Sequence, residues 1–173
     1  MPRLASENLE MAYLGLGANL GQPAATLAAA REQLAVLPLS RLVAVSALYR
    51  TAPVGGPAGQ PDFFNAVLAL ATALEPVQLL ERTLAIEEGF GRKRLQHWGP
   101  RTLDIDLLFH GTRLVAEPGL QLPHPRLHLR RFVLEPLCEL AAEMIHPRLG
   151  VTLRQLLAQL PGSDRVERLN RPW

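Results

Sequence analysis

A chain of 173 residues, 48% of them hydrophobic and 20% charged, is long and apolar enough for one folded domain and is not intrinsically disordered. A formal net charge of +2 is too small to indicate a nucleic-acid-binding protein by itself, and a single cysteine, Cys138, excludes an internal disulfide framework and a cysteine-based zinc site. No apolar run approaches bilayer-spanning length, and residues 1–10 lack the apolar core of a signal peptide, so we expect a cytoplasmic protein without membrane contact.

The first half of the chain divides into strands and helices by its hydrophobic pattern. Alternating apolar residues predict strands, leucine and alanine at helical spacing predict helices that begin at a proline, and a cluster of proline and glycine predicts a loop. The predicted segments are strands over 11–17, 42–49 and 64–73, helices over 23–36 and 76–90, and a loop over 51–62.

The second half begins with a polar, basic loop over 91–100 and continues with a strand that carries Asp104 and Asp106. The sequence then predicts a turn at Gly111, a short strand over 113–115, a rigid Pro-His-Pro corner at 123–125, and helices over 131–143 and 153–160. The order β-α-β-β-α-β predicts a ferredoxin-like α+β sandwich, with helices packed on one face of a mainly antiparallel sheet.

Two carboxylates stand at the start of the fourth predicted strand. Side chains at i and i+2 of a strand share a face, so Asp104 and Asp106 should project together while Leu103, Ile105 and Leu107 turn to the other side. Two such carboxylates repel unless one holds a proton or cations lie between them. Carboxylate and phosphate oxygens are the usual ligands of Mg²⁺, so the pair indicates metal-assisted chemistry on a phosphorylated substrate. The competing interpretation is a solvated acidic pair at a strand edge.

Five ordered blocks of this sequence resemble the 6-hydroxymethyl-7,8-dihydropterin pyrophosphokinases of folate biosynthesis. The most specific is Trp-Gly-Pro-Arg-Thr-Leu-Asp-Ile-Asp at 98–106, which is similar to the signature of that family. The other blocks lie at 15–21, 46–51, 60–65 and 123–126, and the resemblance covers about residues 12–160.

The resemblance implies that the chain moves the diphosphoryl group of ATP to the hydroxymethyl oxygen of the pterin and releases AMP. It also implies two Mg²⁺ ions and a six-stranded, ferredoxin-like α/β/α sandwich. We therefore expect one pyrophosphokinase domain over 12–173, preceded by a flexible N-terminal extension over 1–11. The expected substrates are ATP and 6-hydroxymethyl-7,8-dihydropterin, and a monomer that binds neither nucleic acid nor membrane is expected.

The resemblance also assigns roles residue by residue. The metal ligands are Asp104 and Asp106, and these two act in catalysis together with Arg92 and Arg101. The ATP-binding positions are Glu87, Arg92, Arg94, Trp98, Arg101, His124 and Arg130. The pterin-binding positions are Thr51, Val54, Phe63, Asn65, Trp98 and Phe132.

Several of these residues have a plainer interpretation. Arg92 and Arg94 could belong to an ordinary basic surface loop, Trp98 could fold back on its own loop, and Phe63 and Phe132 could be core residues. Glu87 could be a solvated residue at a helix end, and His124 could be a structural histidine at its corner. Arg130 could exchange roles with Arg131.

The sequence also departs from the family pattern at a few positions. Phe63 replaces a tyrosine of some members, while Pro125 and Gly119 replace a tyrosine and an arginine, which puts part of the adenosine-phosphate contacts in question. Two other functions remain open at this point: a ferredoxin-like RNA-binding module and a non-catalytic regulatory homologue. The first would require aromatic-rich strands, whereas aromatic residues are only 5% of this chain.

Overall fold

The computed structural model describes residues 8–53, 55–91, 102–162 and 165–173. At its centre lies a six-stranded sheet of order β5-β1-β4-β3-β8, in which β2 also pairs with β4, and every ladder is antiparallel. The elements are β1 (Glu10–Ala18), α1 (Pro23–Ala35), β2 (Ser40–Val45), β3 (Tyr49–Thr51), β4 (Phe63–Thr72), α2 (Pro76–Gly89), β5 (Asp104–His110), β6 (Val115–Glu117), β7 (Leu120–Leu122), a 3₁₀ turn η1 (Leu127–Leu129), α3 (Arg131–Ala141), α4 (Leu153–Gln159) and β8 (Val166–Arg168).

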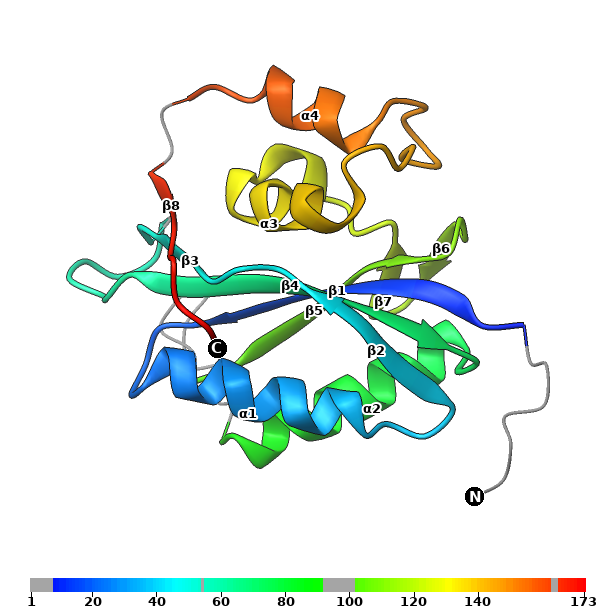
Figure 1. Ribbon diagram of the computed structural model, residues 1–173, viewed down its shortest axis with the longest axis horizontal. Helices are drawn as coiled ribbons and strands as arrows, with labels where there is room; N and C mark the ends of the chain where they lie inside the picture. The colour runs from blue at the N-terminus through cyan, green and yellow to red at the C-terminus, as the bar shows by residue number, and fades with distance from the viewer. Residues whose placement is uncertain (1–7, 54, 92–101, 163–164) are drawn as a thin grey trace.

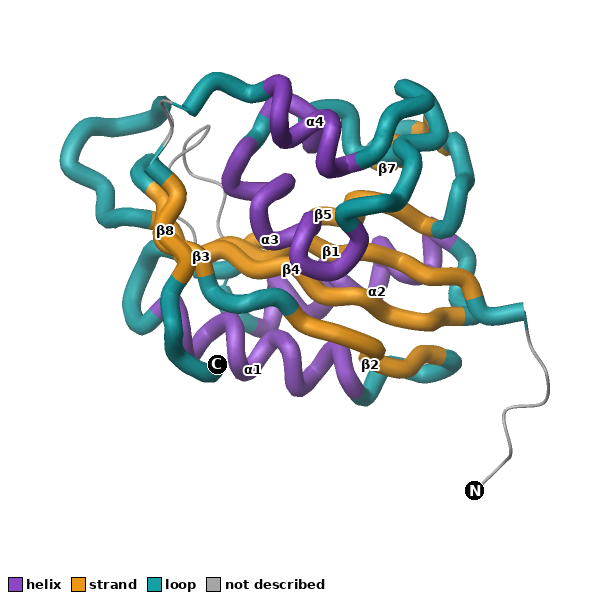
Figure 2. Tube along the Cα trace, turned by 45° about the horizontal axis from the view of Figure 1, so that its top comes forward, coloured by secondary structure: helices purple, strands orange, loops and turns teal. Residues whose placement is uncertain are grey.

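Helices cover both faces of the sheet. Helices α1 and α2 lie on one face, and α3 and α4 lie on the other (Figures 1 and 2). Each pair encloses its own core, and β4 contributes to both: Leu68 packs in the α1–α2 core, while Val67 packs in the α3–α4 core. Alternate residues of a strand point to opposite faces, so a nearly continuous apolar strand such as β4 is what a central strand of a three-layer fold needs.

The ferredoxin-like α+β fold is therefore confirmed, with the α/β/α layers that the family resemblance implied. The expectation of helices on one face is wrong, because the order β-α-β-β-α-β contains only α1 and α2 and leaves out the C-terminal pair. The covered sheet also argues against an RNA-recognition module, which needs an open sheet face on which to stack bases.

Two other predictions about strands need correction, and two short strands were missed. Residues 42–49 form two strands rather than one: the main-chain N–H of Val67 bonds to the Ser46 hydroxyl at 2.9 Å, and this side chain interrupts the ladder between β2 and β3. The strand expected over 113–115 lies at 115–117 and pairs with β7 in a separate two-stranded sheet. The short strands β7 and β8 were not predicted.

The helices begin and end close to the predicted residues. Pro23 and Pro76 open α1 and α2, and Glu75 and Gln78 form a capping box at the start of α2. None of the helices in the described part of the chain has the length and apolar character to cross a membrane.

Candidate active site

The two aspartates lie at the start of β5, which forms one edge of the sheet. Their neighbours Ile105 and Leu107 are buried in the α1–α2 core, so Asp104 and Asp106 project together toward the α3 face. The common orientation that the i, i+2 spacing predicts is confirmed.

Strand register brings the pterin positions to the same face as these carboxylates. Asn65 on β4 lies opposite Gly17 on β1, and Gly17 in turn lies opposite Asp104 on β5. Directly opposed residues of antiparallel strands share a face, so Asn65, Gly17 and Asp104 form one row across three strands. Asp106 continues that face two residues along β5.

Gly17 keeps the middle of this row open. A Cβ at this position would lie 2.9 Å from the side-chain oxygen of Asn65, closer than real Cβ atoms approach. In the sequence, the Gly-x-Gly of the first strand was the signal for a position without a side chain. Only the register shows that Gly17 lies between the carboxamide of Asn65 and the carboxylate of Asp104.

Three of the predicted pterin positions, Thr51, Phe63 and Asn65, are held by contacts within the sheet. Asn65 is 8% exposed and donates from Nδ2 to the Thr51 hydroxyl at 2.8 Å, while Thr51 pairs with Phe63 across β3 and β4. Phe63 therefore shares the face of Thr51 and Asn65, whereas the adjacent Phe64 packs against the α1–α2 core. Phe132 stands on the first turn of α3 and packs against the other core.

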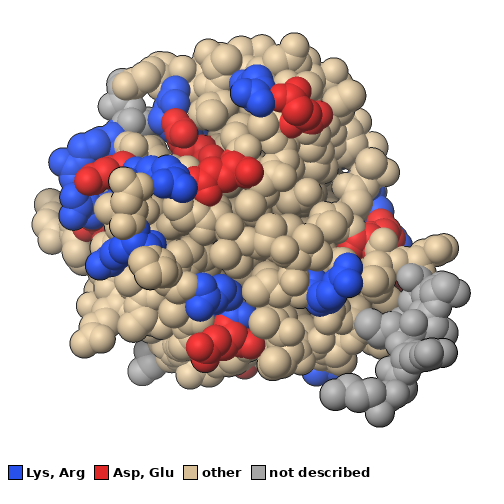
Figure 3. Space-filling view, in the orientation of Figure 1, with Lys and Arg blue, Asp and Glu red and all other residues tan. Residues whose placement is uncertain are grey.

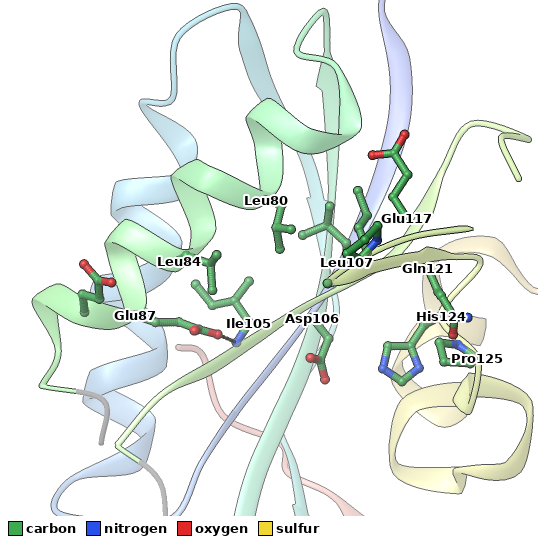
Figure 4. A pocket seen from close by; sticks show the side chains of 14 residues that line it. Leu80, Leu84, Glu87, Ile105, Asp106, Leu107, Glu117, Gln121, His124 and Pro125 are labelled. Carbon is green, nitrogen blue, oxygen red and sulfur yellow. Dashed lines mark hydrogen bonds between the residues drawn. The ribbon is translucent and has the colours of Figure 1, made fainter. Parts of the chain in front are cut away.

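A cavity of about 930 Å³ opens beside the carboxylates at the β5 edge (Figure 4). Helix α2, strand β5 and the β6–β7 hairpin supply most of its wall. Its lining includes Leu80, Leu84, Glu87, Ile105, Asp106, Glu117, Leu120, Gln121, His124 and Pro125. This volume is at the upper end of the range for small-molecule sites and suits a nucleotide. The sequence did not predict the contribution of the hairpin, because β6 and β7 are only three residues each.

Glu87 is buried beneath this cavity rather than solvated at a helix end. It is 1% exposed, and its Oε1 accepts the main-chain N–H of Ile105 at 2.7 Å (Figure 4). Ile105 lies between the two aspartates, so Glu87 fixes the backbone from which both carboxylates project.

His124 faces the cavity as a neutral donor. The pKa of His124 is lowered from 6.5 to about 4, mainly by burial and then by the positive charge of Arg130, while the negative charge of Asp104 acts in the opposite direction. Its Nδ1 accepts the main-chain N–H of Arg126 at 3.2 Å, which leaves the proton on Nε2. At neutral pH the ring can therefore donate a hydrogen bond without adding a charge.

This burial predicts a pH-dependent stability. Between pH 6.5 and pH 4 the unfolded chain binds a proton at His124 that the folded chain does not, so stability falls as the pH falls through that window. The free energy of unfolding of the wild type should fall by an extra amount as the pH is lowered over this range. In His124→Asn we expect this decrease to be smaller by about 1–3 kcal/mol. Urea denaturation at several pH values measures the slope, and an equal slope in both proteins would contradict the assignment.

Arg130 and Arg131 are distinguished by their contacts. Arg130 lies with its guanidinium 5.7 Å from the centre of the Phe132 ring, next to the pterin positions. Arg131 bonds instead to Glu135 at 2.9 Å and to the carbonyl oxygen of Leu160 at 3.2 Å. These bonds give Arg131 a structural role between α3 and the segment after α4.

The remaining predicted site residues, Val54, Arg92, Arg94, Trp98 and Arg101, lie outside the described residues. Within the described ranges, no three or more His, Cys, Asp or Glu side chains form a cluster that could hold a metal ion. The carboxylates of Asp104 and Asp106 are hard oxygen donors, which fit Mg²⁺ when phosphate and water oxygens complete its shell.

This chain is similar in sequence to a known family of enzymes. Residues 13–142 match the family described as 7,8-dihydro-6-hydroxymethylpterin-pyrophosphokinase. The 2-amino-4-hydroxy-6-hydroxymethyldihydropteridine pyrophosphokinase of Pseudomonas aeruginosa is 45% identical over 161 residues, which cover 93% of this chain and 98% of that protein. Its counterpart in Methylorubrum extorquens is 48% identical over 158 residues, covering 90% of this chain and 98% of that protein.

Solved structures show the same fold. The HPPK-DHPS protein of Plasmodium falciparum superimposes with a TM-score of 0.70 at 16% identity, over 90% of this chain and 44% of that longer one. A likeness at this identity supports the fold, while the sequence relatives support the family. This chain belongs to the 7,8-dihydro-6-hydroxymethylpterin-pyrophosphokinase family.

Proposed function

We propose that this protein is a 2-amino-4-hydroxy-6-hydroxymethyldihydropteridine pyrophosphokinase of folate biosynthesis. The family match and the relatives support the reaction. The observation that carries it in the structure is the single row across β4, β1 and β5, which puts the carboxamide of Asn65 and the carboxylate of Asp104 on one face with Gly17 between them.

The reaction joins two substrates over that row. The hydroxymethyl oxygen of the pterin forms a bond to the β-phosphorus of ATP, and the bond from that phosphorus to the α,β-bridging oxygen breaks. AMP leaves with the bridging oxygen, and the hydroxyl gives up its proton. Because the two substrates must meet in line, the main task of the protein is to position them and to stabilise the charge that develops.

Asp104 and Asp106 are the groups that we propose to hold Mg²⁺, in two ions shared with the triphosphate. Bound there, the metal would neutralise phosphate oxygens around the attacked phosphorus and favour the in-line geometry. Both carboxylates are partly buried and project from a strand that is paired with β1, so the ladder holds the backbone that carries them.

The cavity at the β5 edge is our proposed ATP site. Leu80, Leu84 and Leu120 supply apolar surface, and the Nε2–H of His124 supplies a neutral donor. We assign the phosphates to Arg130 together with Arg92, Arg94 and Arg101, whose planar guanidinium groups suit bidentate binding of phosphate. Trp98 is assigned to a lid over both substrates.

The pterin is proposed to lie on the α3 face of β3 and β4. Phe63 and Phe132 would hold the flat ring between two aromatic faces, while Asn65 reads its polar edge. Thr51 supports Asn65 through their hydrogen bond, and Thr51 and Val54 would line the edge of the ring with main-chain atoms.

A product assay tests this function. Purified protein with ATP, Mg²⁺ and 6-hydroxymethyl-7,8-dihydropterin is expected to form AMP and the pterin diphosphate in equal amounts, and chelation of Mg²⁺ is expected to stop the reaction. ADP in place of AMP would overturn the diphosphoryl assignment. Pterin binding without turnover would favour a regulatory homologue.

The organisation of the chain is part of the proposal. We propose one domain over 12–173 that acts as a monomer in the cytoplasm, without nucleic acid or membrane. Size-exclusion chromatography with light scattering measures the oligomeric state.

A further inference from the structure

The last nine residues, 165–173, form a segment that we call the C-terminal strap. It contains β8 and runs along β3 before it ends beside α1 (Figures 1 and 2). The strap lies at the edge of the sheet opposite β5, as the strand order shows. It is therefore remote from the ATP cavity but adjacent to the proposed pterin positions.

The strap pairs directly with the strand that carries Thr51. Val166 lies opposite Thr51 and Arg168 lies opposite Tyr49 in the β3–β8 ladder. The main-chain N–H of Leu169 extends this pairing with a 2.8 Å bond to the Leu48 carbonyl oxygen. A ladder of three residues is marginal by itself, so β8 needs further attachments to hold β3 in place.

Two residues near the C-terminal end of the strap, Arg171 and Trp173, supply such attachments. The indole N–H of Trp173 donates to the Ser46 carbonyl oxygen at 2.8 Å, and the guanidinium of Arg31 lies 4.9 Å from the centre of the Trp173 ring. The Arg171 guanidinium lies 5.5 Å from the centre of the Phe64 ring, one residue after Phe63. Ser46 lies in the segment between β2 and β3, so the Trp173 hydrogen bond holds the chain just before β3 begins.

Glu139 on α3 ties the strap to β3 from the other face. Its carboxylate accepts the Tyr49 hydroxyl at 2.5 Å, the Ala47 main-chain N–H at 2.8 Å and the Arg168 Nε–H at 2.7 Å. Burial would raise the pKa of Glu139, but these three donors hold that pKa below its usual value. Charged side chains of both signs lie next to one another on the side of the molecule that Figure 3 shows, and Arg168 and Glu139 form one such pair.

Another ion pair joins the start of the strap to the loop before β4. Arg165 lies 3.0 Å from Asp62, the residue before Phe63. The strap thus contacts the chain on both sides of the proposed pterin positions, while none of these contacts involves a residue that lines the ATP cavity.

We propose that the C-terminal strap is a positioning element for the pterin site, which sets the affinity for the pterin ring and leaves nucleotide binding unchanged. It acts by fixing β3, whose Thr51 accepts the hydrogen bond that orients Asn65. The inference rests on the proposed function, because it assigns the pterin to Thr51, Phe63 and Asn65.

The test compares three substitutions in the strap with a control substitution outside it. Trp173→Ala removes the indole bond and the ring, and Trp173→Phe keeps a ring without the N–H. Arg171→Ala removes an exposed side chain, so it remains informative if Trp173→Ala does not fold. Arg154→Ala is the control, since Arg154 pairs with Glu143 at 2.6 Å on exposed surface away from the strap.

Binding is measured with 6-hydroxymethyl-7,8-dihydropterin in the presence of Mg²⁺ and α,β-methylene-ATP, in which the bond that must break is blocked. We expect Trp173→Ala to raise the Kd for the pterin about tenfold, with a smaller rise in Trp173→Phe and Arg171→Ala. The Kd for α,β-methylene-ATP alone should stay at the wild-type value in all variants, and Arg154→Ala should change neither constant.

A lower melting temperature with both constants unchanged would show that the strap is structural only and would overturn the inference. An equal rise in the Kd for the pterin and in the Kd for the nucleotide would overturn it as well, because the strap would then not act on the pterin site selectively. If the wild-type protein itself failed to bind the pterin, the proposed function would fall, and this inference with it.

Discussion

Asp104→Asn and Asp106→Asn are each expected to lower turnover by about a hundredfold to a thousandfold, because removal of one preorganised electrostatic group from a transition state costs about that much. Asparagine keeps the shape of the side chain but loses the negative charge that would hold Mg²⁺ between protein and triphosphate. Both residues are only partly buried at the start of an edge strand, so the variants should fold.

The measurement is the steady-state rate of AMP formation over a range of Mg²⁺ concentrations. Glu143→Gln is a suitable control, since Glu143 is an exposed carboxylate whose partner is Arg154. We expect the control to keep wild-type turnover and Mg²⁺ dependence. Near-normal turnover in either aspartate variant would show that the pair is a solvated feature of the strand and not a metal site.

Glu87→Ala has the second largest expected effect. The substitution leaves the buried N–H of Ile105 without its 2.7 Å acceptor, which we expect to cost about 1–3 kcal/mol of folding stability. It also frees the backbone between the two aspartates, and misplacement of catalytic groups by about 1 Å can lower a rate about a hundredfold. We therefore expect a loss of kcat together with a loss of stability.

Glu87→Gln separates the two possible origins of that loss. Glutamine still offers an oxygen to Ile105, so a positioning role predicts that most of the turnover returns. If Glu87→Gln were as inactive as Glu87→Ala, the charge of Glu87 rather than its hydrogen bond would matter. Denaturation curves and kcat measured on the same preparations distinguish these cases.

Local sequence patterns predicted most of the fold because the elements concerned are long and regular. Helices α1 and α2 carry a proline at their start and apolar residues at helical spacing, and β1 and β4 are long apolar strands. The wrong or missing strand predictions lie where tertiary contacts determine whether a strand forms and where it ends. The division of residues 42–49 depends on the Ser46 hydroxyl reaching the backbone of β4, and β8 forms only because β3 is there to pair with it.

The candidate site divides in the same way. The projection of Asp104 and Asp106 from one face follows from the period of a strand, which any sequence with that spacing would show. The alignment of Asp104 with Asn65 across Gly17 depends on the register of three strands that are far apart in the chain, and register is set by how the whole sheet packs.

By itself, then, the sequence determined the helices, the long strands, the acidic pair and the family resemblance, since each depends on neighbouring residues or on an ordered set of motifs. Only the tertiary structure decided that Glu87 is buried under the acidic pair, that the β6–β7 hairpin walls the cavity, and that the C-terminal strap braces β3. These are contacts between segments that are distant in the chain. They can stabilise the protein only after the fold has brought those segments together at an entropic cost.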